Sequence, residues 1–185
     1  MGIEWIMIGG FHMVILENNR LKLVQPDLQY LEAMHRIHAD PSTNRYNPGG
    51  PHESLEQTRE MLLNWMDDWT RDEIGYFIII EKASNDVIGM CGVRYRDWQN
   101  GRIFNLAYRL DTAYTRKGYT KEANELVLQY IHDTIDTNPK IVARTKYNNI
   151  PSIKTAEALG LALNPRFDNF EEPGDVYLFN KGCFA

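Results

Sequence analysis

The chain contains only two cysteines, Cys91 and Cys183, among its 185 residues. A pair this sparse makes no disulfide framework, and its spacing matches no zinc site. Both residues stand in strand-like runs, so we expect two buried free thiols. Free thiols suit a reducing compartment, which leads us to expect a cytoplasmic protein.

A hydrophobic run long enough to cross a membrane is also missing. The apolar stretch at residues 5–16 is shorter than the roughly 20 residues that a transmembrane helix needs. No cationic segment precedes it, so we expect no secretory signal and no membrane partner. The stretch could be a first strand or a poorly ordered extension, and the sequence leaves both readings open.

Positive charge is not in excess. The chain has 20 Lys and Arg residues against 25 Asp and Glu residues, a formal net charge of −5. This balance argues against a nucleic-acid partner, which would call for a basic surface. A negative protein would instead attract cationic substrates, such as amines, by long-range steering. Backbone N–H groups and a few local cations can still bind an anionic cofactor.

Metal-ligand spacing and internal repeats are absent as well. Of the five histidines, His35 and His38 stand at i, i+3 in a predicted helix, but no third ligand is suggested. We therefore expect no metal site. The length, with 43% hydrophobic and 24% charged residues, is typical of one globular domain over residues 1–185.

Hydrophobic periodicity divides the chain into strands and helices. Seven strands are predicted, at residues 20–24, 76–82, 87–95, 102–110, 141–147, 161–170 and 175–181. Four helices are predicted, at residues 26–40, 53–72, 119–134 and 151–160. Asn100-Gly101 marks a hairpin tip between two of the strands. The order predicts an α+β fold with a mixed, mostly antiparallel sheet and helices on its faces.

The segment before the third helix carries the most chemical information. It reads Thr115-Arg116-Lys117-Gly118-Tyr119-Thr120. Glycine at a helix start lets a ligand approach the backbone, and the free N–H groups of the first turn favour an anion. Arg116 and Lys117 add formal charge at the same place. The segment therefore suits a pyrophosphate.

This segment resembles the phosphate-binding turn of the GNAT superfamily of acetyltransferases. The family pattern is Arg or Gln, two residues, Gly, one residue, then Gly or Ala. Here Gly118 keeps the central position, while Thr115 and Thr120 replace the outer ones. Further segments match in order over residues 20–182: Arg20-Leu-Lys-Leu23, Val87-Ile-Gly89, Ala107-Tyr-Arg-Leu110, Glu122-Ala123, Asn149-Ile-Pro-Ser152 and Ala158-Leu-Gly-Leu161. Together they are similar to the ribosomal-protein N-terminal acetyltransferase (RimJ/RimL-like) branch.

The resemblance implies a GNAT-like sheet and an N-acetyltransferase that uses acetyl-CoA as cosubstrate. It also implies a β-bulge near the end of the 102–110 strand, which splays two strands and frees N–H groups for the thioester. It assigns protonation of the departing thiolate to Ser152. The residues that it assigns to coenzyme A are Tyr108, Arg109, Leu110, Arg116, Lys117, Gly118, Tyr119, Thr120 and Asn149.

Simpler readings stand beside these assignments. Ser152 follows Pro151 and could only cap a helix. Asn149 could be an ordinary turn residue. Glu171 and Glu172 read as a solvated turn, although a carboxylate there could face the acceptor. No general base is assigned.

The acceptor is expected to be an amine, either a small molecule or a protein N-terminus. Deprotonating an α-amine at pH 7 costs about 1 kcal/mol, whereas a lysine costs roughly 4.6 kcal/mol, so the lack of an obvious base favours an α-amine. A second reading is an acyl-CoA-binding module that has lost turnover, which the altered Thr115 and Thr120 motivate. Edge strands near the C-terminal end also make a homodimer plausible.

Overall fold

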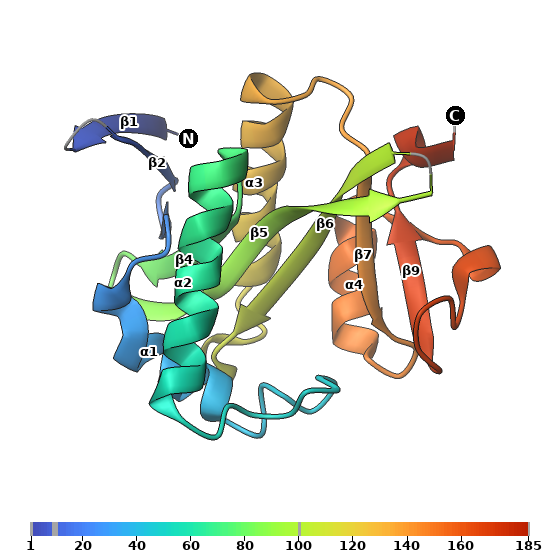
Figure 1. The fold of residues 1–185 in the computed structure, drawn as a ribbon, viewed down its shortest axis with the longest axis horizontal. Coiled ribbons are helices and arrows are strands. Elements are labelled where there is room, and N and C mark those ends of the chain that lie inside the picture. Colours follow the sequence, from blue (N-terminus) through green and yellow to red (C-terminus); the bar gives the residue numbers. More distant parts are fainter. Residues whose placement is uncertain (1, 9–10, 100, 185) are drawn as a thin grey trace.

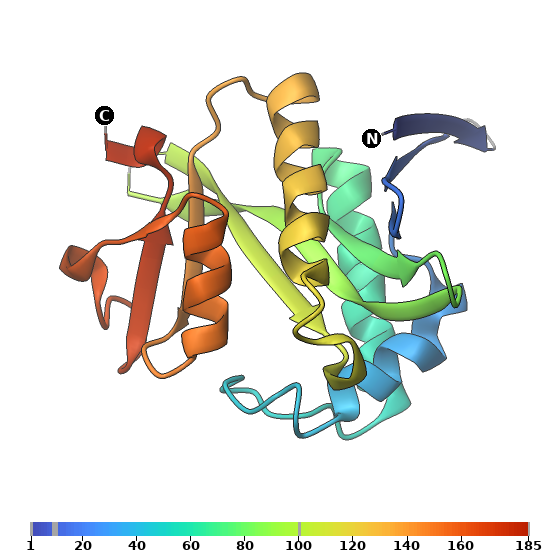
Figure 2. The same cartoon turned by 180° about the vertical axis from the view of Figure 1, so that it is seen from behind.

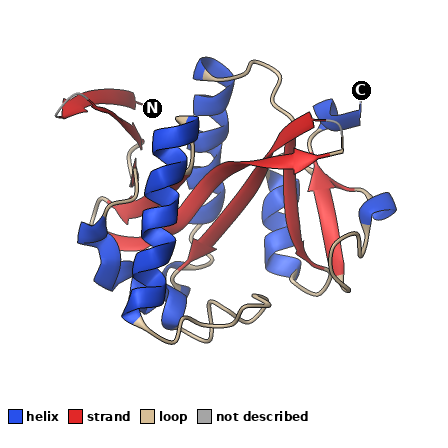
Figure 3. Ribbon diagram, viewed as in Figure 1, coloured by secondary structure: helices blue, strands red, loops and turns tan. Residues whose placement is uncertain are grey.

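The computed structural model describes residues 2–8, 11–99 and 101–184. Its strands are β1 Gly2–Ile8, β2 Phe11–Glu17, β3 Leu21–Val24, β4 Tyr76–Glu81, β5 Asp86–Trp98, β6 Gly101–Leu110, β7 Ile141–Lys146, β8 Ala162–Leu163 and β9 Asp175–Phe179. They form one sheet in the order β1-β2-β3-β4-β5-β6-β7-β9-β8 (Figures 1 and 3). Only β6 and β7 are parallel neighbours; the other described pairs are antiparallel. The α+β prediction is confirmed, with β1 and β2 added to the seven predicted strands.

Four helices cover the two faces of the sheet. Helices α1 (Leu31–Ala39) and α2 (Leu55–Asp72) lie on one face, and α3 (Tyr119–Thr134) and α4 (Ile150–Ala158) lie on the other (Figures 1 and 2). The continuous apolar run of β4 fits this arrangement, because strand residues alternate between faces. Phe77 and Ile79 pack in the cluster that includes Val127 of α3, whereas Ile78 packs with Leu62 of α2.

The apolar stretch near the start of the chain forms a hairpin. Strands β1 and β2 pair from Gly2↔Glu17 to Ile8↔Phe11, and β2 continues the sheet beside β3. The first of the two open readings is therefore correct for the described part of this stretch. Residues 9 and 10 lie outside the described residues, as does Asn100 at the predicted tip of the β5–β6 hairpin.

The predicted strand at residues 161–170 is wrong beyond Leu163. Only Ala162 and Leu163 pair with β9. Pro165 then begins a short 3-10 turn that Asn164 caps, since its Oδ1 accepts the Arg166 N–H at 3.2 Å. Proline cannot donate to a ladder, and the turn directs Phe167 into the core instead.

Two further expectations have mixed outcomes. Both cysteines are free, and Cys91 is buried in β5, but Cys183 is only half-buried and lies in a 3-10 turn rather than a strand. The end of α4 follows the prediction: Gly160 has φ +87° and the Leu161 N–H donates to the Ala156 carbonyl at 3.0 Å. Within the described part of the chain, no helix is both long and apolar enough to cross a bilayer.

Candidate functional site

A cleft opens where β6 and β7 separate. The two strands pair only from Phe104↔Ile141 to Leu106↔Ala143, although β6 continues to Leu110 and β7 to Lys146. The cleft measures about 620 Å³, and its lining comes from both strands, the loop at residues 42–49, the segment between β6 and α3, and the start of α4. Backbone groups on this edge of β6 have lost the neighbouring strand, and such groups need other partners.

The expected bulge is not the cause of this separation. The β5–β6 register runs without interruption from Gly89↔Leu110 to Trp98↔Gly101. An extra residue would shift that register. The prediction of a bulge at Tyr108–Leu110 is therefore wrong for this ladder, and the gap arises because β7 diverges from a regular β6.

The turn before α3 has the backbone conformation that its glycine allows. Gly118 has φ +82° and Arg116 has φ +62°, both in the left-handed region. The first helical hydrogen bond runs from the Glu122 N–H to the Gly118 carbonyl at 3.1 Å. The N–H groups of residues 119–121 therefore precede the helical ladder, and together with the helix dipole they favour an anion.

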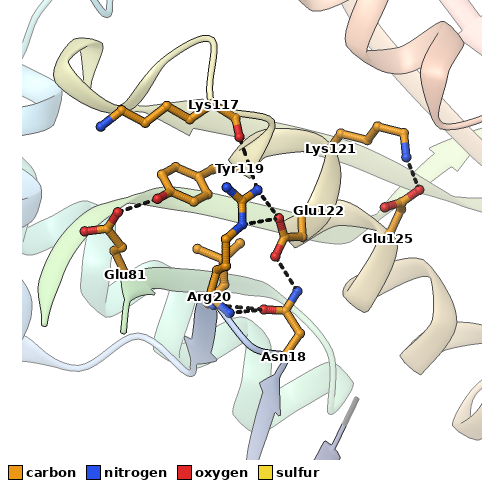
Figure 4. Close-up of polar contacts among 9 residues, drawn as sticks. Asn18, Arg20, Glu81, Lys117, Tyr119, Lys121, Glu122 and Glu125 are labelled. Carbon is orange, nitrogen blue, oxygen red and sulfur yellow. Dashed lines mark hydrogen bonds and ion pairs between the residues drawn. The ribbon is translucent and has the colours of Figure 1, made fainter. Parts of the chain in front are cut away.

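A polar network fastens this turn to the connection between β2 and β3 (Figure 4). The Arg20 Nη2 donates to the Lys117 carbonyl at 3.1 Å, and its Nε donates to Glu122 at 2.9 Å. The Asn18 Nδ2 donates to the other Glu122 oxygen at 2.7 Å. Two of the segments that match the family, one at Arg20 and one at Glu122, therefore contact each other although about a hundred residues separate them. Sequence spacing did not indicate this contact.

Tyr119 belongs to the same network and faces away from the cleft. Its ring lies under the Arg20 guanidinium, 4.5 Å from centroid to Cζ, and its hydroxyl donates to Glu81 of β4 (Figure 4). That hydrogen bond raises the pKa of Tyr119.

Of the residues assigned from sequence, those that line the cleft are Tyr108, Arg109, Leu110, Thr120, Asn149 and Ser152. Those that lie beside it are Arg116, Lys117, Gly118 and Tyr119.

Asn149, rather than Ser152, caps α4. Its Oδ1 accepts the Ser152 N–H at 3.3 Å, and its Nδ2 donates to Thr145 at 3.0 Å. The capping role considered for Ser152 is therefore wrong, and its hydroxyl is available for another partner. That hydroxyl donates to the Tyr108 Oη at 3.2 Å, while the Tyr108 hydroxyl donates to the Ser152 carbonyl at 2.8 Å. Burial raises the pKa of Tyr108, so this hydroxyl stays protonated at neutral pH.

Two acidic side chains near the cleft, Glu171 and Asp175, are held by cations. Glu171 forms ion pairs with Arg96 and Arg144, and it remains exposed in the turn as expected. Glu172 is exposed. Asp175, which lines the cleft, is 2% exposed and binds Arg144 at 2.6 Å and Lys146 at 2.7 Å. Both of its oxygens are engaged by these cations, so neither is free to accept a proton from an amine.

Sequence spacing missed a cluster of histidines on the α1 side of the cleft. His35 and His52 each lie 2.8 Å from the Thr58 hydroxyl, and the His38 and His52 rings are 4.9 Å apart. Arg109 reaches His38 from β6. Among the described residues, no group of three or more His, Cys, Asp or Glu side chains is placed to hold a metal ion.

The chain that forms this cleft is similar to known proteins. The family model for the acetyltransferase (GNAT) domain matches residues 20–162. The chain is 28% identical over 172 residues to the uncharacterized N-acetyltransferase p20 of Bacillus licheniformis, covering 91% of this chain and 96% of the relative.

Solved structures share the fold at low sequence identity. The RimL ribosomal L7/L12 α-N-protein acetyltransferase superposes with a TM-score of 0.75 at 13% identity, covering 96% of this chain and 99% of that one. The microcin C7 self-immunity acetyltransferase MccE, solved with acetyl-CoA and AMP, superposes with a TM-score of 0.71 at 17% identity, covering 88% and 93%. From the family model, which spans more than half of its residues, we conclude that the chain belongs to the GNAT acetyltransferase family.

Proposed function

We propose that the protein transfers an acetyl group from acetyl-CoA to an amine, and that the cleft between β6 and β7 holds the thioester arm. The observation that carries this proposal is the continuity of the cleft with the N-terminus of α3. Thr120 lines the cleft and belongs to the same first turn whose N–H groups are free. An unpaired strand edge suits an extended amide-containing arm, and a free helix N-terminus suits a pyrophosphate.

Acetyl transfer to an amine needs a polarised thioester carbonyl, a proton for the departing sulfur and a deprotonated amine, and we propose that the described residues supply the first two. Acetyl-CoA supplies the activated acyl group. Backbone N–H groups at Tyr108–Leu110 are proposed to bind the thioester carbonyl, and the hydroxyl pair of Ser152 and Tyr108 to give a proton to the departing sulfur. The amine must lose its own proton, and among the described residues that line the cleft there is no free carboxylate to take it. A peptide α-amine, whose pKa is only about 1 unit above neutrality, would lose this proton with the least help, in line with the RimJ/RimL-like branch.

The alternative is an acyl-CoA-binding module without turnover. Thr115 and Thr120, the two departures from the family pattern, both line the cleft. Thr120 adds bulk where Gly or Ala would let a ligand approach the backbone, and Thr115 lacks the long polar side chain of Arg or Gln. Turnover distinguishes the two functions, since only the enzyme releases free thiol when acetyl-CoA and an amine are supplied together.

Coenzyme A and acetyl-CoA are expected to raise the melting temperature, whereas ATP and NAD are not. At a ligand concentration of 100 times the dissociation constant, the gain in unfolding free energy is about 2.7 kcal/mol. For a chain of this length that corresponds to a rise of roughly 5–10 °C. A thermal-shift assay measures it, and no shift at millimolar coenzyme A would contradict both functions.

Arg20→Met is expected to weaken coenzyme A binding about tenfold, or 1.4 kcal/mol, because it releases the Lys117 carbonyl and lets the turn relax. The stability loss should stay below about 1 kcal/mol, since the Arg20–Glu122 pair is partly exposed. The matched control is Lys121→Met, which breaks an exposed ion pair with Glu125 on the same helix (Figure 4). Equal losses of affinity in both variants, measured by calorimetry, would show that Arg20 acts only through general charge.

A further inference from the structure

Arg109 enters the cleft from the side opposite to the hydroxyl pair. It follows Tyr108 in β6, and successive strand residues point to opposite faces. The Tyr108 hydroxyl contacts Ser152 of α4, whereas Arg109 contacts His38 of α1 and Asn44 of the following loop. An acyl group held between β6 and β7 would thus have the proton donors on one side and Arg109 on the other.

The partners of Arg109 are all neutral. Its Nη1 donates to the Asn44 Oδ1 at 2.5 Å and to the His38 Nδ1 at 3.2 Å. A ring nitrogen that accepts from a guanidinium belongs to a neutral imidazole. Burial lowers the pKa of Arg109, and none of the described carboxylates offsets this effect. The guanidinium is therefore a half-buried cation without a counter-charge among the described residues.

The surroundings of His38 supply no negative charge to Arg109 either. The side chain is 5% exposed, and its Nε2 has no hydrogen-bond partner among the described residues. Burial, followed by the charge of Arg109, lowers the pKa of His38 to about 3, so the ring brings no charge of its own at neutral pH. Half-burying a cation without a partner is costly. An arrangement of this kind is best explained by a ligand that supplies the missing anion.

The charges in the cleft lining point the same way. Among the described residues of the lining, Arg109, Arg144 and Lys146 are the cations, and Asp175 is the one carboxylate. Asp175 and the neighbouring Glu171 pair with Arg144, and Asp175 also pairs with Lys146. Arg109 is the cation of this lining that has no carboxylate partner among the described residues. Although the whole protein is acidic, its cleft is cationic, so the steering of simple cationic amines expected from net charge does not apply at the site itself.

We propose that the acceptor is a small amine that also carries an anionic group, a carboxylate or a phosphate, and that Arg109 binds this group. The proposal rests on the acetyl transfer proposed above. Arginine pairs with both kinds of anion through two parallel N–H donors, and here Nε and Nη2 are not engaged by described residues. Asn44 and His38 would then act as positioning residues that fix the guanidinium plane.

The test compares amines that differ only in the anionic group, with thiol release from acetyl-CoA as the readout. Amino acids are set against their amides for the carboxylate, and phosphoethanolamine against ethanolamine for the phosphate. In at least one of the two comparisons, the anionic amine should have a kcat/KM at least about tenfold higher than its neutral counterpart. A factor of this size corresponds to the free energy of one charge-assisted hydrogen bond. Arg109→Met should remove this advantage, and Arg109→Lys should restore part of it.

A binding measurement keeps the proposal testable without turnover. The coenzyme A-loaded protein is titrated with N-acetyl amino acids, their amides, and N-acetylated phosphoethanolamine. The anionic ligands should bind more tightly, and only to proteins that keep a cation at position 109. The control is Arg45→Met, which removes an exposed arginine of the nearby loop that does not line the cleft.

The outcomes separate the two proposals. Failure of the wild-type protein to bind coenzyme A would overturn the proposed function. Normal coenzyme A binding with no preference for anionic ligands in either arm would overturn the role of Arg109 alone. If Arg45→Met lost the preference for anionic ligands to the same extent as Arg109→Met, the role of Arg109 would also be overturned. The preference would then come from the overall positive charge of the region. Arg109→Met is expected to fold normally, since it removes an unpaired half-buried charge.

Discussion

Gly118→Trp is expected to abolish coenzyme A binding, with a rise in the dissociation constant of at least about 100-fold, or 2.7 kcal/mol. Gly118 stands at the N-terminus of α3, where free N–H groups would meet the pyrophosphate. Its φ of +82° also disfavours any larger side chain, at a cost of about 1–2 kcal/mol in unfolding free energy. Calorimetric titration with coenzyme A measures the affinity, and thermal unfolding measures the strain.

Gly160→Trp is the matched control for this substitution. Gly160 has nearly the same conformation, φ +87°, with open space around its Cα, and it lies at the C-terminal end of α4 outside the cleft lining. The control should lose similar stability and keep its affinity for coenzyme A. If Gly118→Trp binds coenzyme A as well as Gly160→Trp does, the ligand does not occupy the start of α3.

Ser152→Ala and Tyr108→Phe are each expected to lower kcat about 100-fold, the lower range for loss of a general acid, while coenzyme A affinity changes less than about threefold. The two hydroxyls are hydrogen-bonded to each other at 3.2 Å, so each substitution removes one member of a single proton-donating unit. Steady-state rates of thiol release and calorimetric titration separate the two effects.

The double variant Ser152→Ala/Tyr108→Phe decides whether the hydroxyls act as a unit. Groups that act together give strongly non-additive effects, so the double variant should be about as slow as the slower single variant. Multiplicative losses would mean that the two hydroxyls act independently. An unchanged rate in Ser152→Ala would exclude it as a proton donor, and because Asn149 already caps α4, no capping role would remain for it.

The sequence by itself determined the features that depend on local chemistry. The helical spacing of apolar residues predicted α3, and the continuous apolar run predicted β4. Both elements formed where they were predicted, and the glycine before Tyr119 stands at the start of α3. The strand predicted at residues 161–170 failed for a local reason as well, because Asn164 and Pro165 form a capped turn in the middle of that segment.

Only the tertiary structure decided how distant segments meet at the site. The separation of β6 from β7, the contact of Arg20 with Glu122, and the approach of Arg109 to His38 join residues that lie between about 37 and 102 positions apart. Such contacts follow from the stacking order of strands and from which sheet face a helix covers. They are fixed by burial of the whole core rather than by any repeat along the chain. For that reason the sequence indicated an anion-binding turn, whereas the half-buried Arg109, without a counter-charge among the described residues, emerged only from the fold.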